Sequence, residues 1–106
     1  MTAPDAAADD LDTTAVFDAL FATIESRKQT LPDGSYTTAL FTHEKGENAV
    51  LEKVGEEAVE TILAARDDDP DALTAESADL IYHLLVVLSM KGVDIADLRD
   101  ELQSRF

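Results

Sequence analysis

The sequence predicts an all-α protein, a helical bundle of four to five helices that is completed by dimerisation. Apolar residues recur at spacings of three and four, which is the helical period, and no stretch alternates as a β-strand would. Pro32, Gly34, Gly46, Pro70 and Gly92 stand between the periodic segments. With 106 residues and no cysteine, the chain is expected to form one domain without disulfides.

The N-terminal part of the chain should contain a long helix and a short one. Residues 1–11 have little to bury and are expected to be a disordered lead-in, so the domain spans residues 12–106. Asp12, Thr13 and Thr14 offer N-caps for a helix that ends near Lys28. Its apolar side should be Val16, Phe17, Leu20, Phe21 and Ile24. After a turn over residues 31–34, Ser35 is expected to cap a short helix over residues 36–41.

Two longer helices carry most of the remaining apolar residues. One should span residues 48–66, with Glu57 and Glu60 at the edge of its apolar face. That face is predicted to consist of Leu51, Val54, Ala58, Ile62 and Ala65. The other should span residues 71–90 after an Asp69–Pro70 start. From residue 78 it is apolar nearly all round and must be covered on every side, so we expect a second subunit to cover it.

Loop glycines and one further helix complete the predicted domain. Gly46 suits a positive φ in the loop that follows the short helix, and Gly92 ends the long apolar one. Asp94 is expected to cap a last helix, which buries Ile95, Leu98 and Leu102.

Charge narrows the classes of partner. The chain has 23 acidic and 8 basic residues, for a formal net charge of −15. Such a surface repels nucleic acid and anionic membranes, so we expect neither as a partner. It is typical of a protein from a high-salt cytoplasm, and undiminished activity and folding at low salt would contradict that halophilic interpretation. The N-terminus lacks the features of a signal peptide and residues 80–90 are too few to span a membrane, so we expect a cytoplasmic protein.

Carboxylates at matching spacing mark the candidate site. Glu57 and Glu60 are three residues apart on one predicted helix, and Glu76 and Asp79 repeat the spacing on the next. If the helices lie side by side, the four carboxylates converge and repel unless a cation sits between them. Oxygen ligands of this kind suit Mg²⁺, with Mn²⁺ as the alternative. The competing interpretation is a solvated, glutamate-rich surface.

Polar and basic residues near these carboxylates each have more than one interpretation. Lys53 is either a phosphate contact or an ion-pair partner of Glu57 one turn away. His83, one turn after Asp79, is a substrate contact, a support for the ligands or a buried core histidine. The remaining candidates for binding a phosphate or ribose are Arg27, Ser35, Tyr36, Thr37 and Lys45. The alternative for Arg27 is that its positive charge only stabilises the C-terminal end of the first helix.

The pattern Glu56-Glu57-x-x-Glu60, followed by Glu76-x-x-Asp79, resembles the metal signature of the MazG-like all-α nucleoside triphosphate pyrophosphohydrolases. The run from Ser35 to Thr37 and the segment 76–86 are similar to the phosphoribosyl-ATP pyrophosphatase family of histidine biosynthesis. The resemblance covers residue 14 to the end. The segment 42–45 departs from it, being longer and more charged than the family's loop.

The resemblance implies Mg²⁺-dependent hydrolysis of phosphoribosyl-ATP to phosphoribosyl-AMP and pyrophosphate. It implies that the four carboxylates hold the metal and that Glu56 is the candidate for orienting the attacking water, which makes Glu56, Glu57 and Glu60 the catalytic set. Lys53, Arg27 and Lys45 would then bind substrate phosphates. Two alternatives stay open: a pyrophosphohydrolase that acts on (d)NTPs, and a non-catalytic helical dimerisation module.

Overall fold

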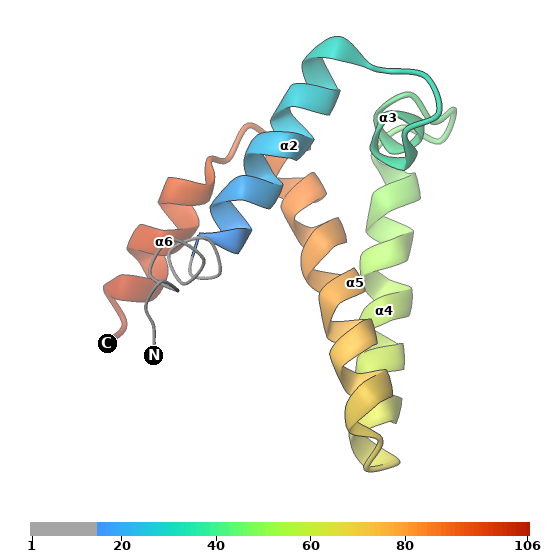
Figure 1. Cartoon of the computed structure of the whole chain (residues 1–106), viewed down its shortest axis with the longest axis vertical. Coiled ribbons are helices and arrows are strands. Elements are labelled where there is room, and N and C mark those ends of the chain that lie inside the picture. Colours follow the sequence, from blue (N-terminus) through green and yellow to red (C-terminus); the bar gives the residue numbers. More distant parts are fainter. Residues whose placement is uncertain (1–14) are drawn as a thin grey trace, which may run out of the picture.

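A computed structural model of the protein describes residues 15–106, and these form five helices without a β-strand (Figure 1). The helices are α2 (Val16–Thr30), α3 (Tyr36–Phe41), α4 (Asn48–Arg66), α5 (Pro70–Met90) and α6 (Ile95–Gln103). The predicted all-α class is confirmed. The predicted lead-in over residues 1–11 and the expected caps Asp12, Thr13 and Thr14 lie outside the described residues.

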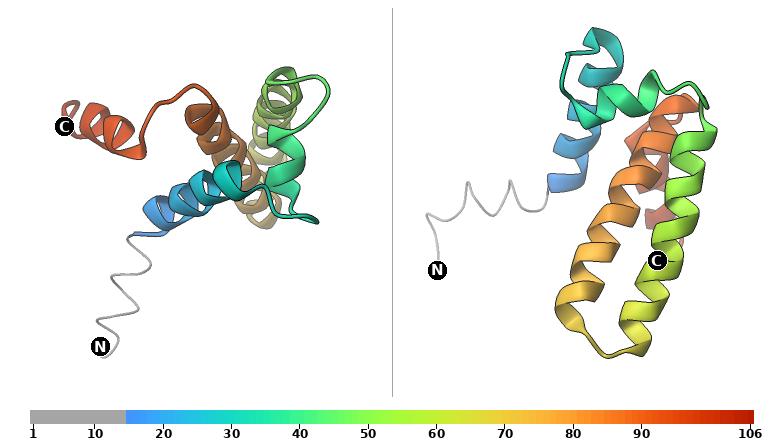
Figure 2. Two further views of the ribbon diagram at one scale, coloured as in Figure 1. Left: turned by 90° about the horizontal axis from the view of Figure 1, so that it is seen from above. Right: turned by 90° about the vertical axis from the view of Figure 1, so that its right-hand side faces the viewer.

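Helices α4 and α5 form a long antiparallel hairpin that is the frame of the molecule (Figure 2). The turn between them is short because Asp68 adopts φ 54° and Asp69 caps α5, its Oδ1 accepting from Ala72 N at 3.1 Å. Pro70 then occupies the first turn of α5, where its missing N–H costs nothing. The predicted start of α5 was one residue late, and the predicted bounds of α4 are confirmed.

The two ends of this hairpin differ in how well they are covered. We call the end packed against α2 and α3 the closed end, and the end around residues 59–78 the open end (Figure 2). Helix α6 lies on the side of α5 away from α4. The radius of gyration, 15.8 Å, exceeds the ~13 Å typical of a compact domain of about 100 residues, which reflects the projecting open end.

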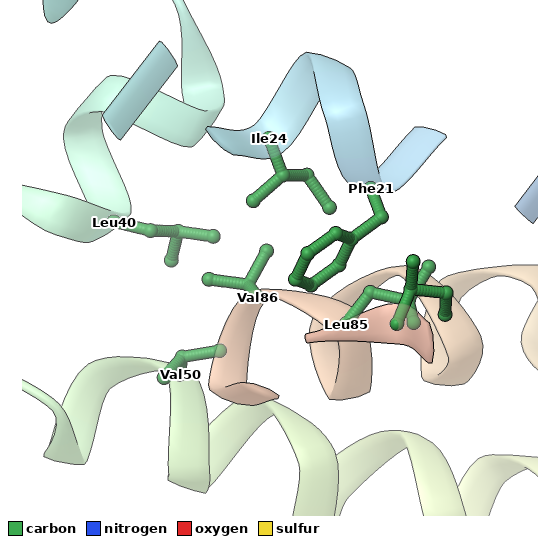
Figure 3. Packing of buried hydrophobic residues seen from close by; sticks show 7 residues of the cluster. Phe21, Ile24, Leu40, Val50, Leu85 and Val86 are labelled. Atoms are coloured by element: carbon green, nitrogen blue, oxygen red, sulfur yellow. The ribbon is translucent and has the colours of Figure 1, made fainter. Parts of the chain in front are cut away.

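The hydrophobic core sits at the closed end, where side chains from α2, α3, α4, α5 and α6 meet (Figure 3). Its buried members include Phe21, Ile24, Leu40, Val50, Leu85, Val86 and Ile95. Val50 and Val86 are fully buried, and they join α4 to α5 directly beneath α2. Burying a side chain of this size contributes roughly 1.5–3 kcal/mol, so this cluster fixes the position of α5 against α4.

Capping residues fix the ends of the shorter helices. Ser35 Oγ accepts from Thr38 N at 3.2 Å, and Asp94 with Asp97 forms a reciprocal capping box, as the sequence predicts for both starts. Helix α2 continues two residues beyond the predicted end, to Thr30, and stops because Leu31 takes a left-handed conformation. The positive φ predicted for Gly46 is confirmed at 62°.

Two predicted apolar faces are wrong in part. The side of α4 that is buried carries Val50, Glu57 and Ala64, at intervals of seven residues. On the predicted face, Leu51, Ile62 and Ala65 are exposed, while Val54 and Ala58 are half-buried. On α6, Ile95 is buried and Leu98 half-buried, but Leu102 is exposed. The helical period is right in both cases. Contacts with the neighbouring helices decide which face is turned inward, and the sequence of a single helix does not reveal those contacts.

In the described part of the chain, α5 is long and apolar enough to cross a membrane by length and composition. The expectation that residues 80–90 are too few to span a membrane concerned that stretch alone, and the whole helix is long enough. Helix α5 nevertheless buries His83, Leu85, Val86 and Ser89 against neighbouring helices. Its polar contacts with those helices, given below, are those of a core helix in a folded domain.

Candidate active site

A buried histidine–glutamate pair joins α4 to α5 near the closed end. His83 is 4% exposed and Glu57 is 9% exposed. His83 Nδ1 lies 2.6 Å from Glu57 Oε1 and 2.9 Å from the carbonyl oxygen of Asp79. Because carboxylate and carbonyl oxygens accept, Nδ1 carries the proton and donates to both. Glu57 is thereby held in one orientation, and its Oε2 has no hydrogen-bond partner among residues 15–106.

Tyr36 of α3 extends this pair into a chain of three side chains. Its hydroxyl lies 2.9 Å from His83 Nε2, which accepts the hydrogen bond when Nδ1 is the donor. Burial raises the pKa of the Tyr36 hydroxyl above its usual value, with Lys53 acting in the opposite direction, so the hydroxyl keeps its proton. The contacts Tyr36–His83–Glu57 therefore connect α3, α5 and α4.

Aromatic packing holds His83 in this position. The ring of Tyr82 lies 4.9 Å from that of His83 at 76°, and the ring of Tyr36 lies 5.7 Å away at 89°, both edge-to-face. The hydroxyl of Tyr82 is hydrogen-bonded to the buried Thr37. Edge-to-face pairs contribute about 0.5–1.5 kcal/mol each beyond their buried area. Of the three open interpretations of His83, a buried residue that supports Glu57 fits these contacts best.

The four carboxylates predicted to hold a metal differ in their surroundings. Glu57 is buried, Glu76 is half-buried, and Glu60 and Asp79 are exposed. Across residues 15–106, no group of three or more His, Asp or Glu side chains stands close enough together to hold a metal ion. Carboxylates repel one another, and Glu57 has a donor in His83 to turn toward. The expected convergence on one point is therefore not present in the single chain, and the metal-ligand set stays a prediction.

Glu56 and Lys53 form an exposed pair on the neighbouring face of α4. Lys53 Nζ lies 3.4 Å from Glu56 Oε1, and this hydrogen bond raises the pKa of Lys53. The alternative in which Lys53 simply pairs with Glu57 is wrong, because its partner is Glu56, three residues away. Both side chains are accessible, so either can meet a ligand at modest cost.

The predicted binding residues of α2, α3 and the following loop have partners within the protein. Arg27 Nη1 donates to Ser35 Oγ at 3.2 Å, which ties the end of α2 to the start of α3. The hydroxyls of Ser35, Tyr36 and Thr37 are all hydrogen-bonded. Lys45 pairs with Glu52 at 3.0 Å on the surface. Ser35 and Thr37 thus serve the fold, and Lys45 remains accessible.

An open cavity of about 230 Å³ lies between α3, the loop after it and α4. Its polar lining comes from Tyr36, His43, Lys45, Glu52, Lys53 and Glu56. From the sequence, His43 was interpreted as a loop residue close enough to Lys45 to touch a phosphate, and it was not placed among the site residues. Sequence reasoning also missed Tyr82, which only its neighbour His83 indicates.

The sequence is similar to one family of known proteins. The profile of the phosphoribosyl-ATP pyrophosphohydrolase family matches residues 17–106. A phosphoribosyl-ATP pyrophosphatase of Haloquadratum walsbyi is 68% identical over 90 residues, covering 85% of this chain and 90% of that protein. Its namesake from Haloarcula marismortui is 67% identical over 94 residues, covering 89% of this chain and 96% of that protein. The histidine biosynthesis bifunctional protein HisIE of Bacteroides thetaiotaomicron is 51% identical over 82 residues, 77% of this chain and 39% of that protein.

Proposed function

The chain belongs to the phosphoribosyl-ATP pyrophosphohydrolase family, and we propose that it hydrolyses phosphoribosyl-ATP to phosphoribosyl-AMP and pyrophosphate, the second step of histidine biosynthesis. The family match over residues 17–106 carries this proposal, because it includes every site residue discussed above. The haloarchaeal relatives also agree with the halophilic interpretation of the acidic surface.

The proposed cofactor is Mg²⁺, with Mn²⁺ as the alternative, held by Glu57, Glu60, Glu76 and Asp79. The donor chemistry supports it, since hard divalent cations prefer carboxylate oxygens and Glu57 Oε2 has no partner in the described chain. When bound, the ion supplies positive charge that stabilises the departing pyrophosphate.

The remaining roles belong to side chains around these carboxylates. Glu56 is proposed to orient the attacking water, and its exposure next to Glu57 makes it accessible to solvent. Lys53, Arg27 and Lys45 are proposed to contact phosphates. Tyr36 and His83 are proposed to hold the Glu57 carboxylate in the orientation that binds the metal, through the hydrogen bonds described above. They are not proposed to take part in the chemical step.

The proposed assembly is a homodimer or higher homo-oligomer in the cytoplasm. Exposed apolar side chains support it, because Val59, Ile62 and Leu63 are 54%, 59% and 49% exposed at the open end. A second copy that covers this end would remove the apolar surface from water.

A pyrophosphate-release assay with a panel of substrates tests the proposed reaction. In molar KCl with Mg²⁺, we expect kcat/KM for phosphoribosyl-ATP to exceed that for each (d)NTP by at least about 100-fold. Similar values across the panel would favour the (d)NTP alternative. No release from any substrate would favour the non-catalytic module.

A further inference from the structure

The cavity between α3, the loop and α4 is a built feature of the fold. The loop turns tightly, with Gly46 N donating to the His43 carbonyl at 2.9 Å and Gly46 at positive φ. His43 Nδ1 accepts from the backbone N–H of Lys45 at 3.0 Å. Because Nδ1 is the acceptor, the proton of the neutral ring is on Nε2, which makes that nitrogen a donor available to a ligand.

This cavity concentrates lysines in a strongly acidic chain, each beside one carboxylate. The whole sequence contains four lysines, and two of them, Lys45 and Lys53, line the cavity. Each is paired with an exposed carboxylate, Glu52 at 3.0 Å and Glu56 at 3.4 Å. Exposed pairs of this kind contribute little to stability, so a ligand anion can replace the carboxylates at small cost. A phosphomonoester, with about two negative charges and three acceptor oxygens, matches the Lys45 ammonium and the histidine N–H.

The cavity also lies at a suitable distance from the carboxylates. Lys53 is four residues from Glu57 and seven from Glu60 on α4, which corresponds to about 6 Å and about 10 Å along a helix axis. Tyr36 lines the cavity and reaches His83, which in turn holds Glu57. A substrate with its triphosphate at the carboxylates would therefore place a group several bonds away in this cavity. In phosphoribosyl-ATP, a purine and two riboses separate the triphosphate from the second phosphate.

We propose that this cavity binds the 5′-phosphate of the ribosyl group attached to the purine, and that it thereby distinguishes phosphoribosyl-ATP from ordinary nucleoside triphosphates. The proposal rests on the proposed function for the identity of the substrate. His43 Nε2 and Lys45 donate to the phosphate, while Lys53, paired with Glu56, lies on the side of the cavity nearer the carboxylates. The small apolar wall formed by Ala39, Leu40 and Ala49 faces the ribose.

Lys45→Met tests the cavity, with Lys91→Met as the matched control. Lys91 forms a comparable exposed pair, with Glu47 at 3.3 Å, and does not line the cavity. Losing a charge-assisted contact to phosphate should raise KM for phosphoribosyl-ATP about tenfold and leave kcat nearly unchanged. The selectivity for phosphoribosyl-ATP over ATP should fall by the same factor in Lys45→Met and stay at the wild-type value in Lys91→Met. Equal selectivity in the two variants would overturn the proposal.

Glu52→Gln provides a test in the opposite direction. This change removes the carboxylate that competes for Lys45, so KM for phosphoribosyl-ATP should fall a few-fold. An unchanged or higher KM would overturn the proposal, because the lysine would then not be in contact with the substrate.

A binding experiment separates failure of this inference from failure of the proposed function. Ribose 5-phosphate carries the proposed group without a scissile bond, and ribose is its control. In NMR titrations of the wild-type protein, ribose 5-phosphate should shift the His43 and Lys45 resonances while ribose does not, and Lys45→Met should weaken the apparent Kd about tenfold. Shifts confined to other residues, or equal shifts with ribose, would overturn the inference whatever the turnover of phosphoribosyl-ATP.

Discussion

The closed and open ends of the α4–α5 hairpin belong to the same two helices but differ sharply in burial. At the closed end, Val50, Val86 and His83 are each under 5% exposed. At the open end, Val59 and Ile62 are more than half exposed. One chain is therefore sufficient for a core around Glu57 and His83, whereas the far half of the hairpin lacks a covering surface. Of the other proposed ligands, Glu60 and Glu76 belong to the open end and Asp79 directly follows it.

The largest effect is expected from removing charge at the proposed metal ligands. Asp79→Asn and Glu57→Gln should each lower kcat/KM for phosphoribosyl-ATP by about 100-fold or more, while circular dichroism shows a folded protein. Stability should change little, because Asp79 is exposed and the amide oxygen of Gln at position 57 can still accept from His83 Nδ1. Asp71→Asn, an exposed carboxylate earlier on α5, serves as the control and should retain activity. Near-wild-type turnover in either site variant would remove that residue from the metal set.

The next effect tests whether a second copy covers the open end. Ile62→Asp should convert the assembly to monomers in light scattering, because a charge without a partner would be buried at the interface. Activity should also fall in the monomer if the second copy holds the proposed metal ligand Glu60 in position. Phe106→Asp is the control, since Phe106 is 98% exposed at the chain end and should tolerate the change. An unchanged mass for Ile62→Asp would show that no copy packs there.

A smaller effect is expected from the core of the closed end. Val86→Ala should lower the free energy of unfolding by about 2 kcal/mol, through lost burial and a residual cavity. Denaturant titration at constant protein concentration measures this value. A loss below about 0.5 kcal/mol would mean that the closed end is less tightly packed than its burial indicates.

The smallest effect concerns the contact between α2 and α5. The Ser89 hydroxyl donates to Glu25 Oε2 at 2.5 Å, and this bond, aided by Lys28, holds the pKa of Glu25 below its usual 4.5. The folded state thus favours the carboxylate. Its stabilisation is present above pH 4.5 and is lost as the pH falls through the lowered value. Because the Glu25 side chain is 34% exposed, the contribution should be a few tenths of a kcal/mol. In Glu25→Gln, the acid-side loss of thermal stability should be smaller than in the wild type. An identical pH profile would rule out this linkage.

The helices were predictable because their signals are local. Ser35, Asp69 and Asp94 each cap the helix start that follows, and Pro70 opens α5, all within a few residues of chain. The inward face of α4 was not predictable in the same way. Leu51 and Ile62 are as apolar as Val50, and only the placement of α2, α3 and α5 decides that the face carrying Val50 and Glu57 is buried.

The site was predictable in its residue types and only partly in its geometry. The spacing of the four carboxylates identifies α4 and α5 as the helices that matter. It does not reveal that Glu57 turns to His83 or that Tyr36 completes the contact, because these residues are 26 and 47 positions from His83 along the chain. The segment 42–45, where the sequence departs from the pattern of the resemblance, contributes His43 and Lys45 to the lining of the cavity.

Metal binding, measured without turnover, tests the central claim most directly. Mn²⁺ can be titrated into the wild type, Glu57→Gln and the control Asp71→Asn in molar KCl, with free Mn²⁺ followed by electron paramagnetic resonance. We predict saturable binding by the wild type and the control, weakened at least about tenfold in Glu57→Gln. Equal binding by all three proteins, or none by the wild type, would contradict a metal site on α4 and α5.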